Sequence, residues 1–199
     1  MQVLLVRHGE SEANHRNMIV SQQGDPALTE HGWWEARETA KHWELHPIQA
    51  VYSSPLLRTR QTASAFLKKG MEVIVDDRLH EIALGRWDGM TIEAIEAADH
   101  ERYHQWKQDP EMGAPDGGEA LSRVAERIQS FLSDVRRQYH EGLIIAATHS
   151  DCMKAAMLST LDAPWTSAQW FHLTNTAGLL LEWRDQHWQI MAQPLAPLK

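Results

Sequence analysis

The segment Val3-Leu4-Leu5-Val6-Arg7-His8-Gly9-Glu10-Ser11 decides the fold of this chain. Its four apolar residues follow one another without alternation, which is typical of a strand that helices cover on both faces of a sheet. A second run of this kind, Leu143–Ala147, leads into Thr148-His149-Ser150. Ligands of parallel α/β sheets bind beyond the carboxyl ends of the strands, so the histidines after these two strands are expected at a binding site.

Strand and helix patterns alternate along the rest of the chain. Two more strands are predicted at Ala50–Ser53 and Val73–Val75, and a closing pair at Ala177–Trp183 and Trp188–Gln193. Apolar residues recur at helical spacing in two segments, so each segment is predicted to form a helix with one apolar face. The first helix follows the candidate N-cap Thr29, and its apolar face holds Trp33, Ala36, Ala40 and Trp43. The apolar face of the second holds Leu121, Val124, Ala125, Ile128, Phe131, Leu132 and Val135. This alternation predicts an α/β fold with a mostly parallel sheet, in which the last pair of strands is the candidate for antiparallel pairing.

The length and net charge of the chain restrict its domain organisation and the ligands that it can bind. The 199 residues are 43% hydrophobic, which is enough for one domain with its own core, and no repeat or long linker divides them. We therefore expect a single domain over residues 1–199, in which residues 91–116 form a candidate cap insertion. The net charge of −8, with 19 lysines and arginines, argues against nucleic acid as a partner and restricts an anionic ligand to a small one.

Cysteine content and hydropathy indicate the compartment. The single cysteine excludes a disulfide framework and a four-thiolate zinc site, and it suits a reducing environment. The apolar run at Val3–Val6 is shorter than the core of a signal peptide, and no stretch approaches the roughly 18 apolar residues of a membrane span. We expect a cytoplasmic protein with no membrane partner.

Charged side chains follow several of the predicted strands. Arg7 and His8 follow the first, His149 follows another, and Arg58 begins a helix after a third. Two guanidinium groups beside two imidazoles form a site for a phosphate dianion, since arginine binds phosphate oxygens bidentately. In such a site a neutral His8 attacks phosphorus, while the arginines and a protonated His149 stabilise the transition state without a metal. Glu81, beyond the next strand, is the expected proton donor to the leaving group and later the base that activates water.

The order of these segments resembles that of the histidine phosphatase superfamily, the phosphoglycerate mutase-like clan. The matching motifs run from residue 3 to about residue 150 and are Leu5–Ser11, Ser53–Thr59, Leu79–Ile82 with Gly85–Gly89, Gly117–Glu119 and Thr148-His149. The resemblance implies a three-layer α/β/α sandwich, a phosphohistidine on His8 and neither metal nor other cofactor. It also implies a phosphate pocket of Arg7, Arg58, His149 and Asn14, with Glu81 as the proton donor.

Within the superfamily the sequence favours hydrolysis over a cofactor-dependent phosphoglycerate mutase. Mutases of the family typically continue from the acidic residue with an Arg-x-Tyr-Gly block and carry a longer insertion with paired arginines. Here Glu81 is followed by Ile-Ala-Leu-Gly, and the short insertion holds isolated Arg102 and Lys107. The chain therefore resembles the small phosphatases of the family, which implies a small phosphorylated metabolite as its partner; a homodimer stays open.

Three features, at four positions, depart from the family pattern. Ser150 stands where the family usually has glycine, and it either donates a hydrogen bond to phosphate or, as we favour, caps a helix that begins at Asp151. Ser21 and Gln22 occupy the usual Gly-Gln turn, with one extra residue nearby, and are candidate substrate contacts. Ala120 replaces the serine of a Gly-Glu-Ser motif.

Two other classes of function compete with the phosphatase. His100-Glu101-Arg102-Tyr103-His104 fits the His-Glu-x-x-His pattern of a zinc metallopeptidase, with Glu119 or Glu126 as a conceivable third ligand. The segment is polar and lacks an apolar flank, so an exposed pair of histidines is the simpler interpretation. The other class is a phosphate-ester binding module without catalysis, against which His8, Glu81 and His149 argue together.

The candidate cap also has an expected role. Its side chains Arg102, Tyr103, Trp106 and Lys107 are predicted to contribute to the choice of substrate.

Overall fold

The computed structural model describes residues 1–111 and 115–192 and contains a six-stranded sheet. The strands are β1 (Gln2–Arg7), β2 (Ile48–Ser53), β3 (Val73–Val75), β4 (Leu143–Thr148), β5 (Gly178–Arg184) and β6 (His187–Ile190). They are ordered β3-β2-β4-β1-β5-β6, and the first four run parallel, whereas β5 is antiparallel to both β1 and β6. The predicted mostly parallel sheet is confirmed, and β6 ends at Ile190, before Gln193, which lies outside the described residues.

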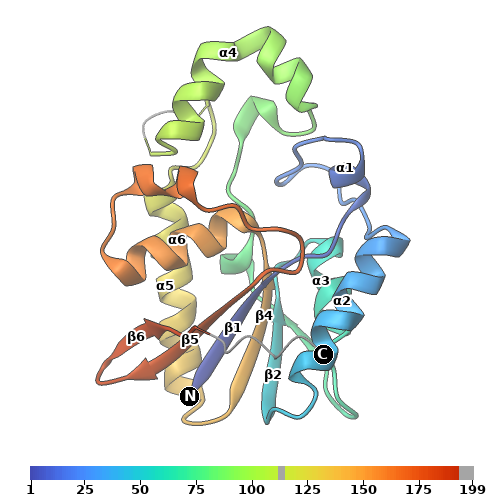
Figure 1. The fold of residues 1–199 in the computed structure, drawn as a ribbon, viewed down its shortest axis with the longest axis vertical. Coiled ribbons are helices and arrows are strands. Elements are labelled where there is room, and N and C mark those ends of the chain that lie inside the picture. The colour runs from blue at the N-terminus through green and yellow to red at the C-terminus, as the bar shows by residue number, and fades with distance from the viewer. Residues whose placement is uncertain (112–114, 193–199) are drawn as a thin grey trace, which may run out of the picture.

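Helices cover both faces of the sheet (Figure 1). One layer holds α2 (Glu30–Trp43) and α3 (Leu57–Ser64), and the other holds α5 (Leu121–Gln138) and α6 (Ser150–Leu161). Successive residues of β1 alternate between two apolar cores, since Val3 and Leu5 pack on the α5 side and Leu4 and Val6 on the α3 side. The three-layer α/β/α sandwich is confirmed, and the unbroken apolar run at the start of the chain is explained by burial on both faces.

The predicted face of α5 is fully buried, whereas that of α2 differs at one position. Thr29 does cap α2, since its Oγ1 accepts a hydrogen bond from the Gly32 amide at 3.0 Å. Trp33 stays half-buried, with the Arg37 guanidinium 5.5 Å from its ring centre, and it joins neither core. Gly32 takes the inward position instead, because α2 approaches the loop after β1 so closely that a Cβ there would lie 2.0 Å from the Glu10 carbonyl oxygen.

A cap segment stands beyond the carboxyl ends of the strands (Figure 1). It contains α4 (Ile92–Gln108), which begins at the N-cap Thr91 and is kinked at Asp99, where the backbone angles are not helical. The shorter elements are α1 (Glu12–His15), η1 (Asp77–Leu79), η2 (Gly85–Trp87) and η3 (Trp165–Trp170). The cap is anchored in the core by the fully buried Trp87, whose ring packs edge-on against Tyr103 and Trp106.

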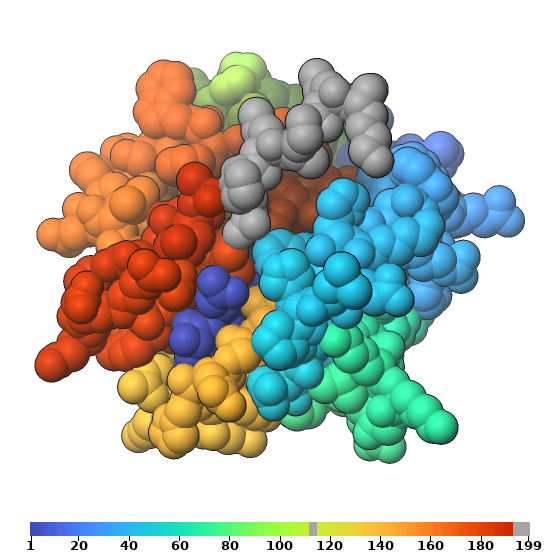
Figure 2. Space-filling view, turned by 60° about the horizontal axis from the view of Figure 1, so that its bottom comes forward, coloured from blue at the N-terminus to red at the C-terminus, as the bar shows by residue number. Residues whose placement is uncertain are grey.

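Figure 2 shows the opposite end of the molecule, where the first residues (dark blue) emerge between the β5–β6 hairpin (red) and α2 (cyan). None of the helices within residues 1–111 and 115–192 is long and apolar enough to cross a membrane.

Candidate active site

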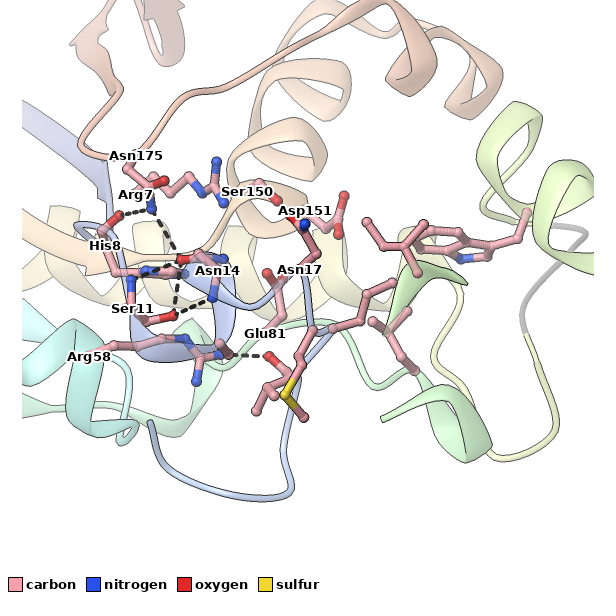
Figure 3. A pocket seen from close by; sticks show the side chains of 17 residues that line it. Arg7, His8, Ser11, Asn14, Asn17, Arg58, Glu81, Ser150, Asp151 and Asn175 are labelled. Carbon is pink, nitrogen blue, oxygen red and sulfur yellow. Dashed lines mark hydrogen bonds between the residues drawn. The ribbon is translucent and has the colours of Figure 1, made fainter. Parts of the chain in front are cut away.

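The sheet order brings the ends of three strands together. β4 lies between β1 and β2, and Arg7 of β1 pairs with Thr148 of β4 in parallel register. The residues that follow therefore meet, and the ring centres of His8 and His149 are 5.3 Å apart. Arg58, in the first turn of α3, is also buried at this edge. Figure 3 shows His8 and Arg58 with Arg7, Asn14 and Glu81 around one cavity of about 310 Å³.

The ring of His8 presents one nitrogen for chemistry. Its Nδ1 lies 2.8 Å from the Gly9 carbonyl oxygen, which only accepts hydrogen bonds, so Nδ1 carries the proton and Nε2 keeps its lone pair. Burial, followed by the charges of Arg58 and Arg7, holds the pKa of His8 well below its ordinary value. The imidazole is therefore neutral and nucleophilic at neutral pH.

The backbone around His8 is fixed from both sides. The Asn175 side chain donates from Nδ2 to the His8 carbonyl oxygen at 3.0 Å, and the Gly9 amide donates to Thr62 Oγ1 at 3.0 Å. A Cβ on Gly9 would lie 2.4 Å from the Gly32 carbonyl oxygen, so only glycine allows this loop and α2 to approach so closely.

Within the part of the chain that the structure describes, Arg7 and Arg58 each hold a buried side-chain nitrogen with no hydrogen-bond partner. Arg58 donates from Nη2 to the Val20 carbonyl oxygen at 3.0 Å, whereas its Nη1 is buried without a partner. Arg7 donates from Nη1 to the Leu173 carbonyl oxygen, and its Nε is buried without a partner. A buried unpaired donor is costly, so these two groups are set up for an anion that enters the cavity.

Glu81 is a nearly buried carboxyl group beside this cationic cluster. Its side chain is 12% exposed, and its Oε1 accepts a hydrogen bond from the Ile82 amide at 2.9 Å. Burial, with a further contribution from the Asp151 carboxylate, raises the pKa of Glu81 to about 7. Such a group gives or takes a proton at neutral pH, which is the property that general acid and base catalysis requires.

His149 differs from the protonated imidazole that the sequence predicted. Its Nε2 lies 2.9 Å from Ser54 Oγ, and its Nδ1 lies 3.4 Å from Arg58 Nη2, which is a donor only. Complete burial, then the charge of Arg58 and the neighbouring His8, hold the pKa of His149 well below its ordinary value. These surroundings favour the neutral ring, with its Nδ1 lone pair facing Arg58.

Asn14 and Ser150 both line the cavity. Asn14 Oδ1 accepts hydrogen bonds from the Ser11 amide and hydroxyl at 3.1 and 3.0 Å, which leaves the Nδ2 hydrogens available. Ser150 is the first residue of α6 rather than its cap, so the favoured interpretation was wrong. His149 has extended backbone angles and is itself the N-cap residue, but its side chain makes no cap hydrogen bond, since its ring nitrogens face Ser54 and Arg58.

Ser21 and Gln22 do not line the cavity. Ser21 is fully buried, and its amide and that of Gln22 donate to the Asp88 carboxylate at 2.7 and 2.8 Å. This bonding holds the preceding Val20 carbonyl against Arg58. The turn therefore positions Arg58.

Sequence reasoning missed Asn17, Asp151 and Asn175, which line the cavity. Asp151 directly follows Ser150, so the helix start beside a catalytic strand was a usable signal. Asn175 precedes β5 in an irregular segment and reaches His8 only through the tertiary fold, so no pattern in the chain marks it.

The outer wall of the cavity is apolar and comes from the N-terminal loop, the residue before η2 and the cap. It includes Met18, Ile19, Leu84, Ile92 and Trp106.

Tyr103, Lys107 and Arg102, the other three cap residues that the sequence predicted to contribute to the choice of substrate, contact other side chains of the protein. Tyr103 is buried against Trp87, Lys107 lies over the Tyr103 ring, and Arg102 pairs with Asp116.

The third zinc ligand considered from the sequence, Glu119 or Glu126, is wrong. Glu119 pairs with Arg127 at 3.0 Å, and Glu126 pairs with Arg123 at 2.8 Å, on another part of the surface. The carboxylate beside His100 and His104 is Glu96, which lies one helical turn before His100 and two turns before His104 on α4.

Comparisons with known proteins agree on one family. Residues 3–194 match the model of the histidine phosphatase superfamily (branch 1). Phosphoserine phosphatase 1 of Hydrogenobacter thermophilus is 34% identical over 164 residues, which are 81% of this chain and 76% of that protein. A protein of Photorhabdus laumondii named "Probable phosphoglycerate mutase GpmB" is 28% identical over 193 residues, covering 94% and 87% of the two chains. Among solved structures, the mycobacterial glucosyl-3-phosphoglycerate phosphatase in complex with VO3 superposes with a TM-score of 0.88 at 25% identity, covering 96% of each chain.

Proposed function

This chain belongs to the histidine phosphatase superfamily (branch 1), and we propose that it hydrolyses a small phosphomonoester through a phosphohistidine on His8. One observation carries the proposal: the neutral His8 ring keeps a free Nε2 beside buried, unpaired arginine N–H groups. The likeness to phosphoserine phosphatase 1 and to glucosyl-3-phosphoglycerate phosphatase supports a phosphatase that acts on a small phosphorylated metabolite.

The first half-reaction transfers the phosphoryl group to the enzyme. The phosphate oxygens bind the unpaired N–H groups of Arg7 and Arg58 and the Asn14 amide. His8 Nε2 attacks phosphorus as the bond to the ester oxygen breaks, and protonated Glu81 gives its proton to that oxygen. The alcohol leaves, and the phosphoryl group stays on His8 Nε2.

The second half-reaction returns the enzyme to its starting state. Glu81, now a carboxylate, takes a proton from a water molecule that attacks phosphorus. The bond between phosphorus and His8 Nε2 breaks, inorganic phosphate leaves, and Glu81 is again protonated. Every step uses side chains of this chain, so we propose that no metal is required.

His149 responds to the charge of the bound phosphate. His149 does not itself line the cavity, but its ring centre lies 5.3 Å from that of His8, so a phosphate dianion bound at His8 opposes the effect of Arg58 and raises the pKa of this imidazole. The ring then adds positive charge where the transition state carries negative charge on its equatorial oxygens.

The mutase alternative uses the same phosphohistidine with a second hydroxyl as acceptor. The greater identity with a phosphatase than with the named mutase, 34% against 28%, favours water as that acceptor. We further propose a single domain, which a family match over residues 3–194 supports, and a cytoplasmic location, which the single cysteine supports.

The test is hydrolysis of para-nitrophenyl phosphate with excess chelator throughout, for the wild type, His8→Ala and His15→Ala. His15 is an exposed histidine in the same N-terminal region and serves as the matched control. We expect turnover in the wild type and the control and none in His8→Ala, with acid-labile phosphate on a peptide containing His8 after rapid quenching. Turnover by His8→Ala contradicts the mechanism, and tight binding of phosphate esters without turnover by the wild type indicates a binding module.

A further inference from the structure

Three potential metal ligands converge on the cap helix α4, outside the catalytic cavity. Glu96 Oε2 lies 2.7 Å from His100 Nδ1 and 3.2 Å from His104 Nε2, and one ligand atom from each residue lies within 4.8 Å of the others. We propose that these side chains bind a zinc ion, which clamps the two halves of α4 together.

The kink in α4 makes this convergence geometrically feasible. Residues eight positions apart on a straight helix are separated by about 12 Å along its axis. Asp99 has non-helical backbone angles, φ −150° and ψ 37°, and it lies between Glu96 and His100. The bend brings Glu96 of the first half within hydrogen-bond distance of His104, two turns further along the chain.

Buried contacts fix the kink in the backbone of α4. Asp99 Oδ2 accepts a hydrogen bond from Trp87 Nε1 at 2.9 Å and also pairs with Arg86. Trp87 is 1% exposed and packs in the main core. The bend at Asp99 is therefore tied to the interior of the protein.

The donor set suits zinc. Two imidazole nitrogens and one carboxylate oxygen are typical of sites in which water or another group completes a tetrahedron. Zinc bonds of 2.0–2.1 Å in a tetrahedron separate the ligand atoms by about 3.3 Å, so small rotations of the side chains suffice. The side chains of Glu96, His100 and His104 are 32%, 67% and 45% exposed, which gives the ion a path from solvent.

A zinc ion bound at this cluster would restrain two residues of the wall of the catalytic cavity. Ile92 precedes Glu96 on α4, Trp106 follows His104, and both line the outer wall of the catalytic cavity. An ion that joins the two halves of the helix therefore restrains both contacts at once. The site takes no part in phosphoryl transfer, and the proposed phosphatase mechanism does not depend on it.

The test is calorimetric titration of the full chain with zinc chloride after chelator treatment, for the wild type, Glu96→Gln, His100→Gln and His104→Gln. His187→Gln is the matched control, since His187 is an exposed histidine in β6. We expect one ion per wild-type and control chain, and zinc affinity weakened by at least about 10-fold in the three ligand variants, since loss of a group that only orients a ligand already costs about 10–100-fold. Circular dichroism confirms that each variant is folded.

Hydrogen exchange provides a second readout that does not involve activity. With free zinc at about 100 times its dissociation constant, openings that break the site become about 100-fold rarer. We expect this protection for the amides of residues 92–108 in the wild type and not in His104→Gln. The proposal is overturned if the wild type binds no zinc, if His104→Gln binds as tightly as the wild type, or if zinc binds without protecting α4.

Discussion

Glu81→Gln tests the proposed proton transfer while leaving the shape of the site intact. Glutamine has nearly the same size as glutamate, and its Oε1 still accepts the hydrogen bond that the Ile82 amide now donates at 2.9 Å. The variant differs in that its amide can neither give a proton to the leaving group nor take one from water. Because general acid catalysis contributes about 10²–10⁴-fold, we expect kcat/KM for an alkyl phosphate to fall by about that factor.

The leaving group sets the size of the loss. The para-nitrophenolate ion departs readily without a proton, whereas an alkoxide does not, so para-nitrophenyl phosphate should lose far less kcat/KM than an alkyl phosphate. The assay is kcat/KM for both esters from pH 5 to pH 9 in the wild type, Glu81→Gln and the control Glu12→Gln. Glu12 is an exposed residue that pairs with Arg16 at 3.6 Å.

The pH profile gives the sharper comparison. With the pKa of Glu81 at about 7 in the wild type, the protonated fraction falls from one half at pH 7 to about 1% at pH 9. The wild-type kcat/KM for the alkyl ester should therefore fall by about 50-fold over that interval, and Glu81→Gln should lack this fall. Equal slowing of both esters, or the same alkaline fall in Glu81→Gln, would refute the assignment of Glu81.

Four further predictions follow from the same geometry. Arg58→Ala should lower kcat/KM by about 10²–10³-fold, since it removes a preorganised donor to the phosphate, and Arg60→Ala, at an exposed position on α3, should leave the steady-state rate near that of the wild type. Gly32→Ala should destabilise the fold by about 1–3 kcal/mol in urea titration, because its Cβ meets the Glu10 carbonyl oxygen, and an unchanged midpoint would contradict the close approach. Trp106→Ala should raise KM for esters with bulky apolar leaving groups more than for phosphoserine, and equal changes for both would exclude a role in selection. The pKa of Glu81 is raised from its ordinary 4.5 to about 7 in the folded chain, so between these pH values the folded chain binds more protons than the unfolded chain. The free energy of unfolding should therefore decline from about pH 4.5 to pH 7, and Glu81→Gln should raise Tm more at pH 8 than at pH 4.

The parallel core of the fold was predictable because its strands carry a strong signal. Val3–Val6 and Leu143–Ala147 are apolar without interruption, which is typical of parallel strands buried on both faces. The position of Trp33 was not predictable from spacing alone. Which side of α2 faces inward depends on the close approach of Gly32 to Glu10, a contact across the fold.

The candidate site was predictable as far as residues lie next to strand ends. His8, Arg58 and His149 meet because β1, β2 and β4 are neighbours in the sheet. No single motif predicts this arrangement, and only the motifs taken together indicate it. Asn175 and Glu96 reach their partners through an irregular segment and through a kink at Asp99, and neither geometry has a local signature. The state of His149 likewise depends on burial and nearby charge, not on residue type.

The pairing of β1 has a consequence for synthesis of the chain on the ribosome. Gln2 pairs with Leu143 on one side and with Glu182 on the other, so both partners of this strand are translated long after it. At about 5–20 residues per second, the interval before β4 emerges is on the order of ten seconds. Throughout that time the nascent chain carries an unpaired apolar segment, and His8 has no partner histidine until the residues after β4 have been translated. We expect this protein to fold late, to engage chaperones that hold nascent apolar segments, and to yield no active fragment when translation stops before β5.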